Sequence, residues 1–547
     1  MEPYKMIYQE WLDNPYFDAA FREELLALAG DEQELEDRFY RDLEFGTAGM
    51  RGVIGAGRNR INRYTVRRAT QGFANYLKVR QRLVERETCV AIAYDSRRCS
   101  RELAEETASV LAANGFVVYL FDDVRTTPQL SYAVRWLRAI GGVMITASHN
   151  PPEYNGYKVY DENGCQLVPE LAERLTAEVD AVQDPATIRH LPFAEARRSQ
   201  KIVSVPSALD DDYFEMVRGI SLRPLLADSK IRAVYTPLHG TGGPAITRLL
   251  KEAGFESLIP VKEQMQPDGE FPTIRTPNPE ASEAFDVARN YMSGADLAIA
   301  TDPDCDRLGL MTGSGKLLTG NQIGCLFLEY ILSTRKEQGT LTEDHYVVST
   351  IVSTNLAARI AEHYGVRYIQ TLTGFKYIGE QIERDPAHFI MGFEESYGYL
   401  FGPEVRDKDA VMATQMAIEM TTFYGGDLDA ALARLYEKYG YTVEAMISKH
   451  YAGKEGAEQM KRIMADARNP EFSYTKKIDY LVDPTGLTPS DVVKYFIDAD
   501  SWMVFRPSGT EPKLKVYFSV SAKSEDEANR RLADMRRTAE TAIEPRD

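Results

Sequence analysis

The chain has 547 residues, of which 44% are hydrophobic and 27% are charged, a composition typical of folded globular proteins. This length is too great for one hydrophobic core and predicts about three to five domains. The formal net charge is −18, which argues against nucleic acid or an anionic membrane as the main partner. An anionic small molecule can still bind, provided that basic side chains gather in a cleft.

The five cysteines are scattered along the chain and form no C-x-x-C pair, so neither a disulfide framework nor a zinc site is expected. The N-terminal residues include acidic side chains and lack the apolar core of a secretory signal. No apolar stretch reaches the ~18 residues that a membrane-spanning helix requires. We therefore expect a cytoplasmic protein without a membrane partner.

Strands and helices alternate in the first third of the chain. The pattern predicts, in chain order, strand Cys89–Asp95, helix Glu102–Asn114, strand Phe116–Phe121, a helix beginning at Thr127-Pro128 and strand Gly142–Ile145. Thr127 is expected to cap its helix, with Pro128 at the first helical position. Such alternation is typical of α/β layers around a largely parallel sheet.

The same alternation continues through the middle of the chain. Strands are expected at Ile231–Tyr235, Leu297–Thr301, Leu308–Met311, Tyr346–Thr350, Val366–Gln370 and Phe389–Met391. A helix, Pro244–Ala253, follows the first of them. The last hundred residues are richer in charged helix formers, with strands at Met503–Phe505 and Leu514–Ser519, which predicts a smaller α+β domain.

We therefore predict four domains. Three α/β domains of similar build occupy residues 1–205, 206–315 and 316–440, and an α+β domain occupies residues 441–547. No low-complexity linker separates them, so we expect the domains to pack closely around a shared cleft.

The segment TASHNP, at residues 146–151, follows a predicted strand at its carboxyl end, where open α/β sheets bind ligands. Ser148 in this segment would be exposed on a rigid support. An alternative is that Ser148 only caps a turn, as loop serines often do. The G-x-S-x-G pattern of a hydrolase elbow is absent.

The segment DPDCDR, at residues 302–307, places Asp302, Asp304 and Asp306 at alternate positions. In an extended segment these carboxylates would point to one side. Three like charges repel one another unless a cation lies between them, and their oxygens favour Mg²⁺ or Ca²⁺. An EF-hand is excluded because Arg307 and Gly313 occupy its glycine and glutamate positions. A solvated acidic turn is the alternative.

Three further loops could bind an anion or a sugar. The segment RPSGT, at residues 506–510, lies between two predicted strands near Lys513 and Lys515 and suits a phosphate group, although an ordinary hairpin turn is also possible. The segment GFEESYG, at residues 392–398, offers carboxylates to sugar hydroxyls, although Glu395 could simply face solvent or pair with a lysine. The glycine-rich segment GTAGMRG, at residues 46–52, ends in an arginine and could hold an anion.

Together these loops resemble the α-D-phosphohexomutase family, in particular its longer bacterial phosphoglucomutases. TASHNP looks like the family's phosphoserine loop, DPDCDR its metal loop, GFEESYG its sugar loop and RPSGT its phosphate loop, and they occur in the family's order. The resemblance implies three similar α/β domains with mixed, largely parallel sheets. It also implies a C-terminal domain of TATA-binding-protein-like fold and a central cleft.

The resemblance also implies roles for individual residues. Ser148 would be the phosphorylated serine, and Asp302, Asp304 and Asp306 would bind Mg²⁺ together with a phosphoserine oxygen. The residues matched to the reaction centre are Arg51, His149, Lys158, Arg307 and Lys408, with Lys158 or Lys408 as general acid or base. The residues matched to substrate binding are Thr373, Gly374, Glu394, Ser396, Arg506, Ser508, Gly509, Thr510 and Lys515.

The implied activity is phosphoglucomutase activity on glucose 1-phosphate and glucose 6-phosphate, with glucose 1,6-bisphosphate as intermediate and activator. The E-E-S sequence resembles the glucose-preferring members, and Gly398 stands where members that also use mannose have histidine. Phosphopentomutase, phosphomannomutase or glucose 1,6-bisphosphate synthase activity are alternatives within the family. A non-catalytic sugar-phosphate sensor and a phosphatase are further alternatives. We expect a small-molecule sugar phosphate as partner, no nucleic acid, and a monomer or small homo-oligomer.

Overall fold

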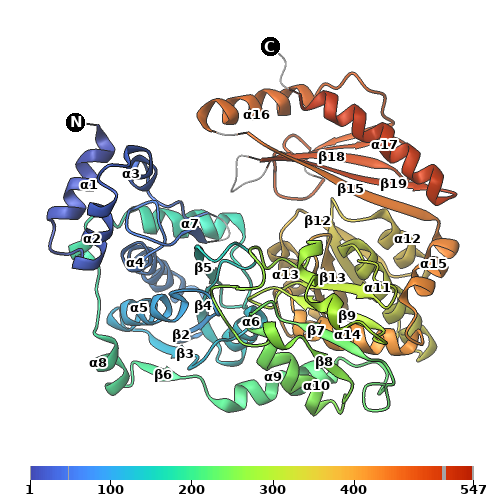
Figure 1. Cartoon of the computed structure of the whole chain (residues 1–547), viewed down its shortest axis with the longest axis horizontal. Coiled ribbons are helices and arrows are strands. Elements are labelled where there is room, and N and C mark those ends of the chain that lie inside the picture. The colour runs from blue at the N-terminus through green and yellow to red at the C-terminus, as the bar shows by residue number, and fades with distance from the viewer. Residues whose placement is uncertain (1, 47–48, 452, 484, 508–512, 545–547) are drawn as a thin grey trace. The chain divides into compact units, whose positions relative to one another are not determined.

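The computed structural model describes residues 2–46, 49–451, 453–483, 485–507 and 513–544 (Figure 1). The chain divides into two compact units. The first comprises residues 1–317, 379–387 and 398–426, and the second comprises residues 318–378, 388–397 and 427–547.

The first unit contains a six-stranded sheet with strand order β1-β5-β4-β2-β3-β6. Its strands are β1 (Met50–Val53), β2 (Glu87–Tyr94), β3 (Val117–Leu120), β4 (Ala139–Ile145), β5 (Tyr154–Tyr160) and β6 (Ile202–Ser204). Strands β4, β2, β3 and β6 run parallel, whereas β5 is antiparallel to both β4 and β1. The predicted mixed, largely parallel sheet is confirmed.

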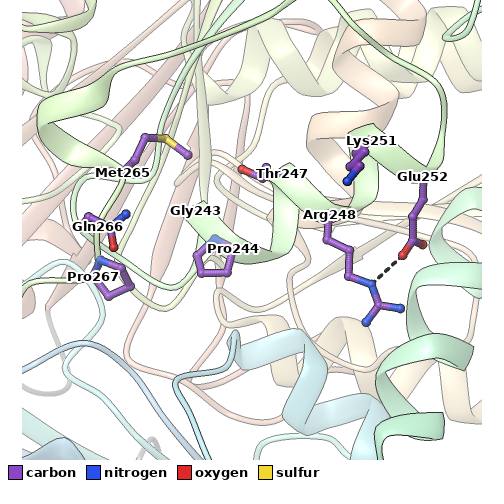
Figure 2. Close-up of a pocket in the computed structure, with 9 residues that line it drawn as sticks. All are labelled: Gly243, Pro244, Thr247, Arg248, Lys251, Glu252, Met265, Gln266 and Pro267. Atoms are coloured by element: carbon purple, nitrogen blue, oxygen red, sulfur yellow. Dashed lines mark hydrogen bonds and ion pairs between the residues drawn. The ribbon is translucent and has the colours of Figure 1, made fainter.

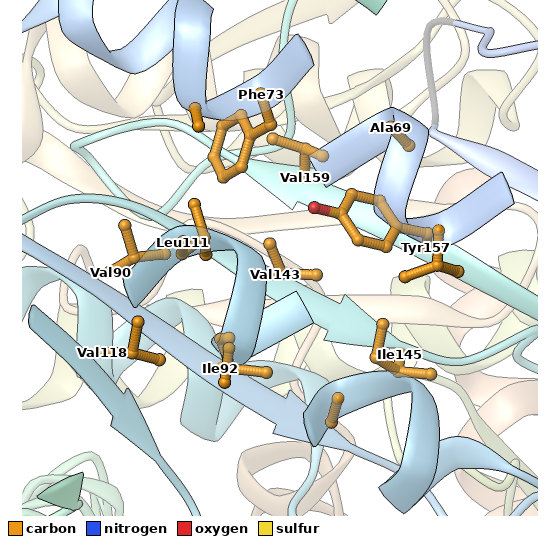
Figure 3. Close-up of a cluster of buried hydrophobic side chains, with 14 of the residues drawn as sticks. Ala69, Phe73, Val90, Ile92, Leu111, Val118, Val143, Ile145, Tyr157 and Val159 are labelled. Carbon is orange, nitrogen blue, oxygen red and sulfur yellow. The ribbon is translucent and has the colours of Figure 1, made fainter. Parts of the chain in front are cut away.

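Alternate side chains of β2 enter two different hydrophobic cores, because successive residues of a strand point to opposite faces. Val90 and Ile92 enter a core that includes Phe73 of helix α4 (Arg63–Arg80) and Leu111 of helix α5 (Ser100–Ala113), as Figure 3 shows. Ala91 and Ala93 enter a second core, which includes residues of helix α6 (Thr127–Trp136). A strand buried on both faces explains the continuous apolar run in its sequence.

Further helices of this part of the chain are α1 (Pro3–Asp13), α2 (Ala19–Ala27), α3 (Glu32–Phe39), α7 (Pro169–Asp180) and α8 (Phe193–Arg198), with the short 3₁₀ helix η1 (Pro185–Thr187). Helix α6 begins one residue earlier than its predicted cap implied. The side chain of Thr126, not of Thr127, accepts the hydrogen bond from the Gln129 amide. Thr126 is the cap because Gln129 lies three residues after it and completes a capping box.

The first unit also contains a four-stranded sheet with order β10-β9-β7-β8. Its strands are β7 (Ala233–Thr236), β8 (Leu258–Pro260), β9 (Leu297–Thr301) and β10 (Leu308–Thr312). Strand β7 is parallel to β8 and β9, whereas β9 and β10 are antiparallel and enclose residues 302–307. The accompanying helices are α9 (Ser207–Gly219), α10 (Gly242–Glu252), η2 (Lys262–Gln264), η3 (Ser282–Phe285) and η4 (Ala288–Tyr291). Strand β14 (Gly398–Phe401) and helix α14 (Ala410–Phe423) complete the unit.

The second unit contains three parallel strands in the order β12-β11-β13. They are β11 (Tyr346–Thr350), β12 (Arg367–Thr371) and β13 (Phe389–Glu394). Helices α11 (Gly320–Glu337), α12 (Asn355–His363) and α15 (Leu428–Tyr439) pack together beside them. Helix α13 (Phe375–Arg384) and the 3₁₀ helix η5 (Pro386–His388) lie between β12 and β13 in the sequence.

The C-terminal part of the second unit is a five-stranded antiparallel sheet with order β15-β19-β18-β17-β16. Its strands are β15 (Tyr441–His450), β16 (Lys476–Asp479), β17 (Val493–Phe496), β18 (Trp502–Pro507) and β19 (Lys513–Ala522). Helix α16 (Gly453–Ala467) packs against β18, and helix α17 (Glu525–Ala542) packs against β15 and β19. The predicted α+β domain is confirmed. The four sheets fall within the four predicted domains, whose exact limits stay predictions.

Among the residues that the structure describes, no helix combines the length and the apolar character needed to cross a membrane.

Candidate active site

The connection between β4 and β5 holds Ser148 in a left-handed backbone conformation, with φ of 52°. A positive φ costs a residue with a side chain roughly 1 kcal/mol or more. The Ser148 amide donates to Thr146 Oγ1 over 2.8 Å, and Ser148 Oγ lies 2.8 Å from Asp302 Oδ2. The serine was expected to be exposed, but it is only 3% exposed because residues of the 302–306 loop lie against it. The loop thus directs the hydroxyl at a carboxylate.

Asp302, Asp304 and Asp306 converge in the connection between β9 and β10. Each offers one carboxylate oxygen within 4.8 Å of the others, and all three residues are buried. The segment was expected to be extended, but it is a turn in which Cys305 has φ of 55°. The turn forms because Asp302 Oδ1 accepts hydrogen bonds from the Asp306 amide at 3.0 Å and the Arg307 amide at 2.9 Å.

The three aspartates fit a small, hard cation. Asp304 Oδ1 and Asp306 Oδ1 are buried and, among the described residues, have no hydrogen-bond partner. A buried acceptor without a donor is costly, and a divalent cation among these oxygens would satisfy both. Carboxylate oxygens are ligands that Mg²⁺ prefers. The second oxygen of Asp304 is already bound, since Thr127 Oγ1 donates to Asp304 Oδ2 over 2.8 Å at the start of α6.

The pKa values of Asp302 and Asp306 shift in opposite directions. Burial raises the pKa of Asp302 well above its ordinary value, and the charges of Asp306 and Asp304 raise it further. Burial also opposes the ionisation of Asp306, but the ammonium groups of Lys408 and Lys158 hold its pKa below the ordinary value. The two lysines therefore keep Asp306 ionised as a carboxylate.

Both predicted lysines reach this cluster from distant parts of the chain. Lys158 on β5 places its Nζ 2.7 Å from Asp304 Oδ2 and 3.5 Å from Asp306 Oδ2. Lys408 Nζ lies 3.1 Å from Asp306 Oδ2 and 3.1 Å from Asp407 Oδ1. Although burial disfavours a charged lysine, Asp304 and Asp306 raise the pKa of Lys158 above its ordinary value. Lys158 is therefore a cation at neutral pH.

His149, Arg51 and Arg307 also lie around Ser148. His149 Nδ1 is 3.1 Å from Ser148 Oγ. Burial lowers the pKa of His149 well below its ordinary value, and the cations of Arg307 and Arg51 lower it further, so the imidazole is neutral at pH 7. Arg51 Nη1 donates to Asn150 Oδ1 over 3.0 Å. Arg307 forms an ion pair with Glu280.

The second unit contains the predicted sugar-binding residues. Glu394 ends β13, and its Oε1 accepts a hydrogen bond from the Gly374 amide over 2.8 Å. This contact joins the loop of Thr373 to the loop of Ser396. For Glu395 the sequence left open whether it binds a sugar hydroxyl, faces solvent or pairs with a lysine. It is half-buried, and its Oε2 accepts a hydrogen bond from Thr350 Oγ1 over 2.9 Å.

The predicted phosphate-binding residues lie partly outside the described residues. Ser508, Gly509 and Thr510 are not among those described. Arg506 is the second-last residue of β18 and pairs across the sheet with Lys515 of β19. Arg506 Nη1 donates to the hydroxyl of Tyr517 over 3.4 Å. Two basic side chains therefore lie side by side near this end of the β18–β19 pair.

Sequence reasoning missed three charged residues of the first unit. Asp407, which precedes Lys408, accepts hydrogen bonds from the hydroxyl of Tyr160 at 2.8 Å and from the side-chain amide of Gln166 at 2.7 Å. These bonds hold Asp407 in place. Glu280 binds Arg307, and Arg97 binds residues 148–154, which we call the serine loop. Of these three residues, only Arg97 could have been identified from the sequence pattern. It follows the carboxyl end of the predicted strand Cys89–Asp95, where ligands of such sheets bind.

A groove of about 720 Å³ lies along helix α10 (Figure 2). It contains none of the predicted site residues. Figure 2 shows Arg248 turned toward Glu252, with which it forms an ion pair. The lining residues are Gly243, Pro244, Thr247, Arg248, Lys251, Glu252, Met265, Gln266 and Pro267. The residues predicted for the reaction centre lie in the buried cluster around Ser148 and not in this groove.

Four family models match the chain in succession. They are described as phosphoglucomutase/phosphomannomutase alpha/beta/alpha domain I, at residues 42–186, domain II, at 211–315, domain III, at 319–439, and the C-terminal domain, at 451–538. A curated phosphoglucomutase from Staphylococcus epidermidis is 36% identical over 530 residues, which cover 92% of this chain and 95% of the relative.

Solved structures share the fold. A phosphoglucomutase/phosphomannomutase family protein from Burkholderia thailandensis superimposes with a TM-score of 0.69 at 20% identity, covering 92% of this chain and 98% of its own. The open form of pp63/parafusin, a phosphoglucomutase from Paramecium, superimposes with a TM-score of 0.71 at 15% identity, covering 93% and 96%.

Proposed function

Because the chain belongs to the phosphoglucomutase/phosphomannomutase family, we propose that it interconverts glucose 1-phosphate and glucose 6-phosphate. The fold is that of the phosphohexomutase isomerases, and the curated relatives are named phosphoglucomutase. The observation that carries the proposal is the 2.8 Å contact between Ser148 Oγ and Asp302 in a buried site with two more aspartates. Two lysines bind the same aspartates.

In the first half-reaction, phosphorylated Ser148 gives its phosphoryl group to O6 of glucose 1-phosphate. The bond between Oγ and phosphorus breaks as the bond between O6 and phosphorus forms, and glucose 1,6-bisphosphate results. The proton of the O6 hydroxyl passes to a general base, for which we propose Lys158 or Lys408 in its neutral form, and Ser148 Oγ takes up a proton as it leaves. Lys158 is a cation beside Asp304 and Asp306, so it would have to release its proton before it acts as the base. His149, which is neutral and 3.1 Å from Oγ, orients the serine oxygen.

Before the second half-reaction, the bisphosphate reorients in the site so that its 1-phosphoryl group faces Ser148. This phosphoryl group is then transferred to Ser148. The bond between O1 and phosphorus breaks as the bond between Ser148 Oγ and phosphorus forms. Oγ loses its proton, O1 takes up a proton from the general acid, and glucose 6-phosphate leaves. The protein must therefore bind the sugar in two orientations. We assign the sugar hydroxyls to Thr373, Gly374, Glu394 and Ser396, and the non-reacting phosphate to Arg506, Ser508, Gly509, Thr510 and Lys515.

Phosphoryl transfer asks the protein mainly for alignment and charge neutralisation. Asp302, Asp304 and Asp306 would hold Mg²⁺, which when bound neutralises charge on the phosphoryl oxygens. Arg51 and Arg307 add positive charge beside the serine, since both cations act on the His149 imidazole. A cationic site in a chain of net charge −18 would focus anionic substrates.

The proposal is tested by the covalent state of Ser148. Wild-type protein incubated with glucose 1,6-bisphosphate should gain the mass of one phosphoryl group, and Ser148→Ala should gain none and lose all turnover. Ser314→Ala, at an exposed position in the β10 hairpin, is the control and should behave as wild type. Rates on glucose, mannose and ribose 1-phosphate then define the sugar. Full activity of Ser148→Ala would refute the mechanism.

A further inference from the structure

Arg97 follows β2, and its side chain is completely buried. The guanidinium donates hydrogen bonds to four main-chain carbonyls of the serine loop. Nη1 contacts the carbonyls of Pro151 and Tyr154 at 2.8 and 3.0 Å, and Nη2 contacts those of Ser148, at 2.6 Å, and Asn150. A planar guanidinium with five donors can serve four acceptors at once, whereas a lysine ammonium has only three donors.

Asp95 holds Arg97 in place. Its Oδ2 lies 3.4 Å from Arg97 Nε, and its Oδ1 accepts hydrogen bonds from the Arg97 amide at 2.9 Å and from Ser100 Oγ at 2.7 Å. Burial lowers the pKa of Arg97 to about 10, against the opposing charge of Asp95. The guanidinium is therefore still protonated at neutral pH and keeps all its donors.

Arg97 also contacts a segment that packs in the same core as β9, the strand before the aspartates. Its guanidinium lies 5.0 Å from the ring centre of Phe271, and its backbone bridges to Gly269. Phe271 belongs to the same hydrophobic core as Ala298 and Ala300 of β9, and β9 ends directly before Asp302. The residue thus links the serine loop to the strand that positions its metal-binding partner.

We propose that Arg97 is a positioning residue, which holds the left-handed Ser148 backbone so that Oγ stays directed at Asp302 during phosphoryl transfer. This inference rests on the proposed function. The conformation of Ser148 is strained, and without the guanidinium the four carbonyls would lose the buried donors that it supplies. A loop freed from these bonds would relax and move Oγ, and a misplacement of about 1 Å can slow a reaction about 10²-fold.

The test compares Arg97→Lys and Arg97→Ala with wild type and with Arg98→Ala. Arg98 is the neighbouring residue and forms an exposed ion pair with Glu270, so its variant should match wild type. For Arg97→Lys we expect kcat to fall about 10²-fold, while the KM for glucose 1-phosphate changes less than about threefold. Added guanidinium chloride should restore part of the kcat of Arg97→Ala and none of that of Ser148→Ala.

Thermal unfolding shows whether each variant folds. If Arg97→Ala does not, Asp95→Asn loosens the same guanidinium with a smaller change and should lower kcat about 10-fold. A kcat of Arg97→Lys within about twofold of wild type would overturn the inference. So would activity that falls only in proportion to the folded fraction, as a purely structural role predicts. A wild-type protein that takes up no phosphate would instead refute the proposed function.

Discussion

At the scale of single residues, the absence of a side chain at Gly398 decides where Lys408 can lie. A Cβ atom added at Gly398 would lie 2.1 Å from Lys408 Cδ and 2.7 Å from its Cγ. The lysine stem passes directly over the glycine, and its Nζ then reaches Asp306 and Asp407. Any larger residue at position 398 would force the stem aside and withdraw the ammonium from Asp306.

We therefore predict that Gly398→Ala lowers kcat/KM about 10- to 100-fold in the protein that keeps Lys408, because the displaced ammonium no longer neutralises charge at Asp306. In the Lys408→Met variant, position 408 carries a flexible and uncharged side chain. There the Gly398→Ala substitution should leave kcat/KM nearly unchanged. The four values of kcat/KM form a double-mutant cycle that measures the coupling.

Gly219→Ala is the control for the glycine substitution, since a methyl group there meets nothing within 4 Å. It should leave kcat/KM unchanged. Equal losses from Gly398→Ala in both backgrounds would show that position 398 does not act through Lys408.

At the scale of elements, the loop after β11 joins two parts of the second unit. Lys494 on β17 is buried and donates to the Ile351 carbonyl over 2.6 Å, with the ring centre of Trp502 at 4.2 Å. One residue earlier, Thr350 donates to Glu395 over 2.9 Å. A single short loop therefore contacts both the C-terminal sheet and the predicted sugar-binding segment.

Lys494 should make the stability of the protein depend on pH. Burial lowers the pKa of Lys494 to about 7, well below its value of about 10.4 in an unfolded chain. Between these values the unfolded chain binds one proton more than the folded chain, so the contribution of Lys494 rises with pH by up to about 1.4 kcal/mol per pH unit. Below pH 7 both states are protonated and the contribution is constant.

We therefore expect wild-type protein to gain stability relative to Lys494→Met as the pH rises from 7 to 10. Urea unfolding of both chains, followed by fluorescence across this range, measures the difference. Lys476→Met, on the neighbouring strand β16 at an exposed position, should show no such trend. A constant difference between wild type and Lys494→Met would mean that Lys494 stays charged in the folded protein.

At the scale of the whole molecule, the buried charges of the first unit come from distant parts of the chain. Ser148 precedes β5 and Lys158 lies on it, the three aspartates follow β9, and Lys408 precedes α14. Carboxylates and ammonium groups lie within 2.7 to 3.5 Å of one another in this cluster. Burying such charges is costly unless each is paired, so a cation bound here would stabilise the fold.

Mg²⁺ should therefore raise the unfolding temperature of the wild-type protein, because a ligand that binds only the native state stabilises it by mass action. At one hundred times its dissociation constant the gain is about 2.7 kcal/mol. Asp304→Asn should lose most of this shift, whereas Asp286→Asn, at an exposed position, should keep it. Scanning calorimetry with and without Mg²⁺ measures this shift of the unfolding temperature independently of activity. An equal shift in both variants would place the ion elsewhere.

The amino-acid sequence alone determined the elements and the chemically distinctive loops. The apolar run at Cys89–Asp95 predicted a strand where the structure has β2, and Leu297–Thr301 and Tyr346–Thr350 were predicted with the bounds that the structure has. The alternate aspartates at 302, 304 and 306 predicted a cation site before any contact was known. These features are local, because apolar periodicity and charge spacing act within a few residues along the chain.

Only the tertiary structure decided which side chains complete the site. Lys158 and Lys408 both contact Asp306, although 250 residues separate them in the sequence. Arg97 binds the carbonyls of the serine loop, Glu395 binds Thr350, and Gly398 makes room for Lys408. Such pairings depend on how strands and loops from different parts of the chain pack together. That packing is set by many buried contacts acting at once, which no single segment of sequence contains.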